Sequence, residues 1–407
     1  MGRRNFDLVI SGAGPIGLAA ALATRAVLGS RARILICDPN FNHPRPSLLF
    51  YAVSAAPRRL LQNIRVWHRL ENPAPVTRME ITDSELRDVI RQNYLTFDQD
   101  ARTVDPLAHM VGHDQLTAAL KEAARDADIQ VRSEPISGLV AREASIEAVL
   151  ATGEPVTAGL VAACDGAQSM VRELAKIPVT GWNYDRIAIV ATVRAERNHE
   201  GVAVQHFLPA GTLALLPLPE QRFSIVWVER PVDAERLCAG STANFEDALQ
   251  ARAGHQFGKL TLVDGPQHYP LRFQIARQLQ RGRVVLLGDA AHTTHPLAGQ
   301  GLNLGLRDVG YLMHYLAADA RLGLDLGAHQ TLLSYERSRR AETLATLGAA
   351  DALFRLFSLH GDAARMIRDT GLGIVESSEK LKAFLIRQAS GITQDFPELL
   401  REETQAI

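Results

Sequence analysis

The sequence is poor in cysteine and has no long apolar run, and each absence excludes a class of protein. Only three cysteines occur in 407 residues: Cys37, Cys164 and Cys238. Such few and widely spaced cysteines argue against a disulfide framework or a cysteine metal site, and they favour a reducing compartment. No run of roughly 18 or more apolar residues is present, so the sequence predicts no membrane-spanning helix.

Net charge is also nearly absent. Lys and Arg number 44 and Asp and Glu 45, which gives a formal charge of −1. This balance gives no electrostatic case for nucleic acid or an anionic membrane as the main partner. The hydrophobic fraction of 46% and charged fraction of 22% are typical of a soluble globular protein. A chain of this length is too long for a single hydrophobic core, so we expect two or three folded parts.

The N-terminus imitates an export signal, because Arg3-Arg4 precede an apolar segment. Asp7 interrupts that segment, and a cofactor motif explains the glycines within it. We therefore expect a cytoplasmic protein.

A glycine-rich turn follows the first predicted strand. Residues 6–10 indicate a buried strand, and Gly12-Ala13-Gly14-Pro15-Ile16-Gly17 comes directly after it. An Ala/Leu-rich helical run then extends to about residue 28, and a second predicted strand, 32–37, ends at Asp38. This is G-x-G-x-x-G between a strand and a helix, with an acidic residue at the end of the next strand.

The spacing has a physical account. Gly12 makes the tight turn, Gly14 lets the chain approach a pyrophosphate, and Gly17 lets the helix pack on the strand. Asp38 accepts hydrogen bonds from a ribose. The motif predicts a bound dinucleotide and does not by itself separate NAD from FAD.

Two later stretches repeat the order of strand, acidic glycine turn and helix. Residues 157–163 predict a strand that is followed by Asp165-Gly166 and a helix from Ser169, although an Asp-Gly pair is also a common plain turn. Residues 284–287 predict another strand, followed by Gly288-Asp289. Gly299 and Gly301 then open an amphipathic helix whose dipole favours negative charge at its start. The late stretch therefore predicts a second part of a cofactor site.

The remaining chain predicts an inserted sheet and a helical C-terminus. We expect a helix over 51–70, strands over 77–82 and 92–97, and a helix over 115–124. Period-two alternation punctuated by prolines, between 187 and 227, predicts an antiparallel sheet. That sheet could wall a substrate pocket or simply cover a core. After residue 308 the pattern is mostly helical.

These features together resemble the single-component FAD-dependent aromatic hydroxylases of the para-hydroxybenzoate hydroxylase fold, and most closely the flavin hydroxylases of ubiquinone biosynthesis. The resemblance extends from Phe6 to about Arg340 and is most specific in the run GDAAHTTHPLAGQGLNLGLRD. Val66-Trp67 and Tyr269-Pro270-Leu271 also resemble that subgroup.

The resemblance implies an α/β fold: an FAD/NAD(P)-binding Rossmann-like domain with an inserted, mainly antiparallel β-sheet substrate domain and C-terminal helices. The implied boundaries are 1–73, 101–178 and 272–345 for the FAD-binding domain, 74–100 and 179–271 for the substrate domain, and 346–407 for the helices.

The resemblance also implies roles for single residues. The ADP half of FAD would lie against the first motif, with Gly12, Gly14, Pro15, Gly17 and Asp38. Asp165 and Gly166 would serve flavin and nicotinamide binding, and Gly288-Asp289 would hold the ribityl chain. The residues expected beside the isoalloxazine are Pro296, Gly299, Gly301 and Asn303, with Pro296 and His295 as the candidate catalytic residues.

Some positions depart from the family pattern or allow another reading. Leu49 stands where related enzymes often have an arginine, and His113 replaces a flavin-contacting Arg, Gln or Asn. Both leave the geometry of the flavin edge and NAD(P)H use open. His292 and His295 could suggest a metal pair, but without further ligands we expect no metal. A structural role for these histidines remains open.

The activity implied is hydroxylation of the aromatic ring of a polyprenylated ubiquinone precursor by O₂, through a flavin C4a-hydroperoxide. No second G-x-G-x-x-G follows a strand, so either NAD(P)H docks on the FAD domain or a separate reductase delivers electrons. The alternatives are hydroxylation of a soluble phenol or polyketide, and a non-catalytic flavin-binding subunit. We expect no nucleic acid partner and at most peripheral contact with the inner face of a membrane. Membership of a multi-enzyme quinone-biosynthesis complex is left open.

Overall fold

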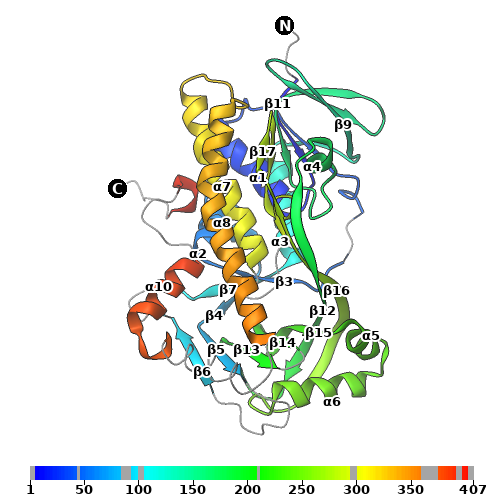
Figure 1. Ribbon diagram of the computed structural model, residues 1–407, viewed down its shortest axis with the longest axis vertical. Coiled ribbons are helices and arrows are strands. Elements are labelled where there is room, and N and C mark those ends of the chain that lie inside the picture. Colours follow the sequence, from blue (N-terminus) through cyan, green and yellow to red (C-terminus); the bar gives the residue numbers. More distant parts are fainter. Residues whose placement is uncertain are drawn as a thin grey trace.

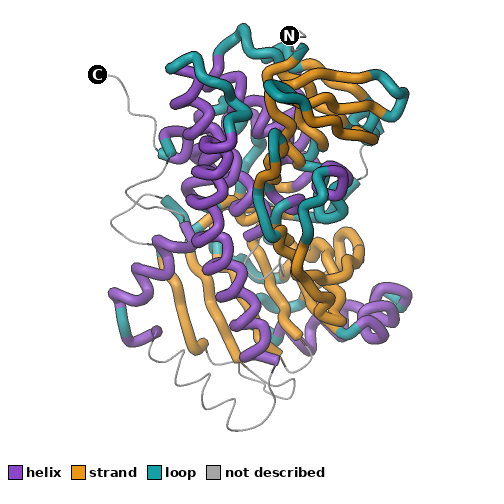
Figure 2. The backbone as a smooth tube through the Cα atoms, turned by 45° about the horizontal axis from the view of Figure 1, so that its top comes forward, coloured by secondary structure: helices purple, strands orange, loops and turns teal. Residues whose placement is uncertain are grey.

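The computed structural model describes residues 5–43, 46–83, 93–99, 105–208, 211–293, 300–358, 375–390 and 397–401. Two large sheets lie one above the other, and two long helices run along one flank (Figure 1). The turned view shows the same two helices side by side along the molecule (Figure 2).

The upper sheet has a parallel centre, as expected for an α/β fold. Its strands lie in the order β17 (Gln280–Arg281), β18 (Val284–Leu286), β11 (Pro155–Ala163), β1 (Phe6–Ser11), β2 (Ile34–Cys37) and β8 (Gln130–Arg132). β10 (Ile146–Leu150) and β9 (Ile136–Ala141) form an antiparallel extension from β11. The short apolar runs are buried strands here, because helices such as α1 (Pro15–Leu28), α3 (His113–Asp126) and α7 (Gln300–Arg321) cover them.

The lower sheet is antiparallel except for one pair, β13 with β5. Its strands lie in the order β19 (His292–Thr293), β16 (Leu260–Ala276), β12 (Val179–Ala195), β15 (Arg222–Glu229), β14 (Gly211–Leu218), β13 (Val202–Leu208), β5 (Arg78–Asp83) and β6 (Asn93–Asp98). One apolar face packs against α5 (Pro231–Ala239) and α6 (Thr242–Ala253). The predicted inserted sheet is confirmed, and its alternation follows from burial of this face.

A small third sheet corrects one expectation. It consists of β3 (Phe50–Val53), β7 (Ala108–Gly112) and β4 (Ala74–Val76). The predicted helix over 51–70 is therefore wrong in its first residues: α2 spans Ala55–Asn63 and the short η1 spans Trp67–Arg69. Tyr51 pairs with Val111, sixty residues later, and the local pattern carries no information about that partner.

The C-terminal part is helical where it is described. α8 (His329–Ser358) runs from the upper sheet to the lower one, where the Tyr184 hydroxyl donates to Asp351 over 2.7 Å and Phe357 stacks on Phe207. α10 (Glu379–Ser390) and η4 (Glu398–Leu400) follow α8 in the chain. The short α4 (Met170–Leu174) lies much earlier, after β11. The domain boundaries given above remain a prediction.

Candidate functional site

Three glycine turns meet at one edge of the upper sheet. β1, β11 and β18 are adjacent and parallel, and their last residues Ser11, Ala163 and Leu286 lie in register. The three predicted motifs begin just beyond these residues. Ligands of open α/β sheets bind beyond the carboxyl ends of the strands, so the topology brings the three predicted motifs to one candidate site.

The glycines of the first motif have different physical roles. Gly12 has φ +100°, and a methyl group on it would lie 2.4 Å from the Cys164 carbonyl oxygen. A methyl group on Gly17 would lie 1.9 Å from the Gly12 carbonyl oxygen. A methyl group on Gly14 would have no described atom within 4 Å. Packing therefore requires glycine at two positions, whereas the third leaves space for a close approach.

Asp38 is held against the first motif. Its Oδ2 accepts a hydrogen bond from the Ala13 N–H over 2.6 Å, and its Oδ1 accepts from the Asn40 N–H over 2.7 Å. A carboxylate offers about four lone-pair positions, so further donors can still bind. Its predicted bond to a ribose stays a prediction.

The second motif anchors a short helix. Asp165 accepts hydrogen bonds from the Ser169 hydroxyl over 2.5 Å and the Val171 N–H over 3.2 Å, while Gly166 has φ +84°. Arg172 is buried and donates to the carbonyl oxygen of Ala290 over 2.9 Å. Arg172, for which no role was predicted, therefore ties the second motif to the third.

The third motif packs on the first. Gly288 has φ +58°, and a methyl group on it would lie 3.1 Å from Ile16 of the first motif. A methyl group on Gly305 of α7 would lie 2.7 Å from the same isoleucine. The two motifs, almost three hundred residues apart, thus form one contiguous surface.

Asp289 has the properties of a ligand-binding carboxylate. It keeps exposed surface, yet its pKa is raised because surrounding protein desolvates it, with His292 opposing the shift. No hydrogen bond to its side chain occurs within the described part of the chain. A methyl group on Gly301, in the first turn of α7, would lie 3.9 Å from its Oδ1. The carboxylate therefore lies beside the helix start with its acceptors available.

The side chain of Asn303 is engaged within the protein. Its side-chain amide donates to the Ala52 carbonyl oxygen over 2.8 Å and accepts from the Ser54 N–H over 3.1 Å. The side chain thus holds the end of β3 against α7, and the predicted flavin contact of Asn303 stays a prediction. The Ser54 hydroxyl in this corner is buried and has no hydrogen-bond partner among the described residues.

The two departures from the family pattern are neighbours. The His113 N–H donates to the Leu49 carbonyl oxygen over 2.9 Å, and His113 Nδ1 lies 2.7 Å from the Tyr51 hydroxyl. Burial, together with Asp289 and Tyr269, raises the pKa of Tyr51, and burial lowers the pKa of His113. The phenol is therefore the donor and the neutral imidazole the acceptor, which leaves an Nε2–H on His113.

The predicted residues His295, Pro296 and Gly299 lie outside the described residues. His292 is buried, with Nε2 placed 2.7 Å from an oxygen of Asp308. No group of three or more potential metal-ligating side chains occurs among the residues described. None of the described helices is both long and apolar enough to cross a membrane.

Taken together, the residues present fit an extended cofactor with a phosphate-bearing half and a polyhydroxyl segment. Gly14 leaves open space at the start of α1, whose free N–H groups favour an anion. Asp289 offers acceptors to hydroxyl groups at the other end of the site. The individual ligand assignments remain predictions.

Comparisons with known proteins agree with this geometry. Residues 5–348 match the profile of a protein family described as "FAD binding domain". The ubiquinone hydroxylase UbiL of Rhodospirillum rubrum is 36% identical over 404 residues, covering 96% of this chain and 91% of that protein. The mitochondrial ubiquinone biosynthesis monooxygenase COQ6 of Danio rerio is 29% identical, covering 95% and 90%.

Among solved structures, p-nitrophenol 4-monooxygenase PnpA from Pseudomonas putida DLL-E4 matches with a TM-score of 0.76 at 20% identity. The match covers 96% of this chain and 99% of that one, and it bears on the fold alone. The predicted fold, the predicted resemblance and FAD as the cofactor are confirmed by these findings.

Proposed function

Because the chain belongs to the FAD-binding-domain family, we propose that it is an FAD-dependent monooxygenase that hydroxylates the aromatic ring of a polyprenylated ubiquinone precursor. The observation that carries this proposal is the 36% identity, over nearly the full length of both chains, to a protein named ubiquinone hydroxylase. Relatives named for ubiquinone biosynthesis at 29% identity support the same substrate class.

The first motif would hold the ADP half of FAD. Gly12 and Gly17 form the turn, Gly14 and Pro15 start α1, and Asp38 would accept from the ribose. FAD, when bound, supplies the activation of O₂, so the protein contributes binding, orientation and exclusion of water. Asp165-Gly166 and Gly288-Asp289 would hold the remaining length, with Asp289 accepting hydrogen bonds from the ribityl hydroxyls.

The start of α7 would stabilise negative charge at the reacting end. The first N–H groups of a helix have no intrahelical acceptor, and the helix dipole adds to their effect. Gly301 and the Asn303 backbone lie in this first turn. Tyr51 and His113 border the same corner and would offer the His113 Nε2–H as a donor. Pro296 and His295, outside the described residues, would lie beside the reacting ring, as the resemblance implies.

Electrons would come from NAD(P)H or from a separate reductase, and O₂ would be the co-substrate. A prenylated substrate would involve at most peripheral contact with the inner face of a membrane. A place in a multi-enzyme quinone-biosynthesis complex stays a prediction. The rate at which NADH or NADPH bleaches the flavin absorbance of the purified protein distinguishes direct reduction by NAD(P)H from reduction by a separate reductase.

The activity is tested with purified protein, a reductant, O₂ and two phenols that differ only in a prenyl tail. We expect visible flavin absorbance and mass-detected hydroxylation that is faster with the prenylated phenol. Equal or faster turnover of the tail-free phenol would contradict the proposal of a prenylated substrate. Absence of bound flavin would contradict the assignment as a flavin-dependent enzyme. Asp289→Asn is the control, since its weaker flavin binding should lower product yield at limiting FAD.

A further inference from the structure

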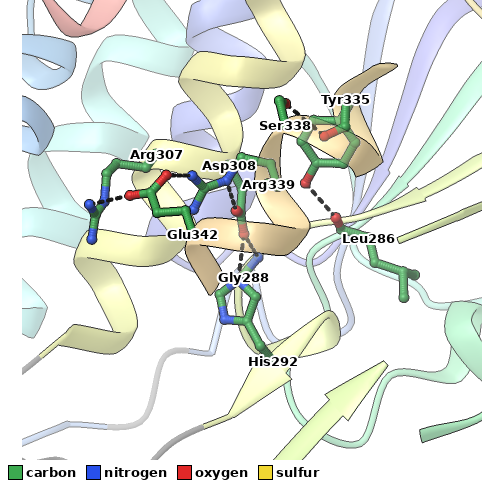
Figure 3. A network of polar contacts seen from close by, with 9 residues as sticks. All are labelled: Leu286, Gly288, His292, Arg307, Asp308, Tyr335, Ser338, Arg339 and Glu342. Carbon is green, nitrogen blue, oxygen red and sulfur yellow. Dashed lines mark hydrogen bonds and ion pairs between the residues drawn. The ribbon is translucent and has the colours of Figure 1, made fainter. Parts of the chain in front are cut away.

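One buried carboxylate connects the Gly288–His292 turn, which carries Asp289, to both long helices, α7 and α8 (Figure 3). Asp308, on α7, is completely buried. Its Oδ2 accepts hydrogen bonds from the Gly288 N–H over 3.0 Å and from His292 Nε2 over 2.7 Å. Its Oδ1 accepts from Arg339 Nε, on α8, over 2.7 Å.

The charge on this carboxylate is maintained by its partners. Burial alone would raise the pKa of Asp308, but His292 and Arg339 outweigh it and lower that pKa. Burial opposes the charge of Arg339 too, yet Asp308 and Glu342 raise its pKa. Asp308 is therefore ionised at neutral pH, and hydrogen bonds to an ionised acceptor are the stronger kind.

The Asp308 carboxylate accepts hydrogen bonds from both ends of the turn that carries Asp289. Gly288 and His292 are the first and last residues of this turn, and each donates to Oδ2 of Asp308. Gly288 has φ +58°, a conformation that must be held by its surroundings. Asp289 lies between the two fixed ends, with no hydrogen bond to its own carboxylate from any described residue.

We propose that Asp308, held by Arg339, is a positioning residue that fixes the Gly288–His292 turn and so presents Asp289 to the cofactor. The inference rests on the proposed function only in taking Asp289 as a cofactor anchor. Arg339 belongs to α8, whose other end contacts the lower sheet through Asp351 and Tyr184. The affinity for FAD therefore depends on how α8 is docked.

A merely structural ion pair would lower stability without acting through Asp289. A double-mutant cycle separates these roles, because residues that act through one another give non-additive effects. Full-length protein freed of flavin is titrated with FAD by flavin fluorescence for wild type, Asp308→Asn, Asp289→Asn and the double variant. We expect each single variant to raise Kd about tenfold, which corresponds to about 1.4 kcal/mol. The double variant should lie within about threefold of the weaker single variant.

Asp325→Asn is the matched control. It breaks the ion pair with Arg283, which is partly buried and joins β18 to the connection after α7 without touching the turn. We expect a lower thermal midpoint for this control but a Kd within about twofold of wild type. Where Asp308→Asn does not fold, Arg339→Lys takes its place in the cycle, because it keeps the positive charge and removes the Nε donor.

Additive effects, with a double variant near a hundredfold, would overturn the positioning role. An Asp289→Asn variant that binds FAD like wild type would overturn both the anchor and the inference. Failure of the proposed function is distinct: the cycle would behave as expected while the wild-type holoenzyme hydroxylated no prenylated phenol.

Discussion

Two glycines of one motif should respond oppositely to the same small change. Gly14→Ala and Gly17→Ala each add one methyl group within four residues of chain. The added methyl meets nothing within 4 Å at Gly14 but lies 1.9 Å from the Gly12 carbonyl oxygen at Gly17. The first position should therefore report on cofactor binding, and the second on folding.

The cost at Gly17 follows from the overlap. An ordinary carbon–oxygen contact is far longer than 1.9 Å, so either the helix or the Gly12 turn must shift. Overpacking of this kind costs about 1–3 kcal/mol, offset in part by the better helix propensity of alanine. A net loss of about 2 kcal/mol would lower the thermal midpoint by roughly 4–8 °C.

The effect at Gly14 appears only when FAD is present. Its backbone, at φ −70° and ψ 177°, is ordinary for alanine. A gain of about 0.4–1 kcal/mol from the stiffer unfolded chain is offset by alanine being a poorer N-cap than glycine. The flavin-free midpoint should stay within about 2 °C of wild type. The Kd for FAD should rise at least about tenfold, because the methyl fills the space that the pyrophosphate needs.

Differential scanning calorimetry of the flavin-free proteins and FAD titration of the same samples measure both quantities. Wild-type affinity in Gly14→Ala would refute placement of the pyrophosphate at this turn. A midpoint loss in Gly14→Ala as large as that in Gly17→Ala would refute the reasoning from space.

Three further predictions follow from individual residues. Burial raises the pKa of Asp289, so the ionised carboxylate lowers the stability of the flavin-free protein above the unfolded-state pKa. Asp289→Asn should therefore raise the flavin-free thermal midpoint at pH 7, and this gain should shrink as the pH falls and the wild-type carboxyl protonates. No gain at pH 7 would contradict this. Asn303→Ala removes the side-chain acceptor of the buried Ser54 N–H, at about 1–3 kcal/mol, and the donor to the partly buried Ala52 carbonyl, so it should lower the urea midpoint. An unchanged midpoint would count against this clamp. Glu376 accepts from the Thr96 N–H of β6 and forms an ion pair with Lys382 of α10 over 2.6 Å. Glu376→Ala releases both contacts and should speed tryptic cleavage at Lys382 with little change in overall stability, whereas an unchanged cleavage rate would argue against that contact.

The parts predicted well from sequence are those coded by short segments. The first strand, glycine turn and helix were predicted at almost their observed positions, because each depends on residues within one continuous stretch. The late strand and α7 follow the same rule. Their assembly at one edge of the sheet follows from the parallel pairing of β1, β11 and β18.

The parts missed depend on partners distant in sequence. Tyr51 was placed in a helix because its pairing with Val111 is not visible locally. The hydrogen bonds between the Asn303 amide and the backbone of Ala52 and Ser54 were not predicted, because these partners lie some 250 residues earlier. Asp308 ends the most recognisable run of the sequence, yet its partner Arg339 lies 31 residues later, where the local pattern predicted only helix.

The central claim is tested most directly by quinone-intermediate profiling in a strain lacking this gene. Lipid extracts are compared by mass spectrometry after complementation with wild type, with Gly14→Ala or with empty vector. We expect the deletion to accumulate a prenylated precursor that lacks one ring oxygen, wild type to restore the hydroxylated product, and Gly14→Ala to restore it poorly. Identical quinone intermediates in all strains would contradict the assignment.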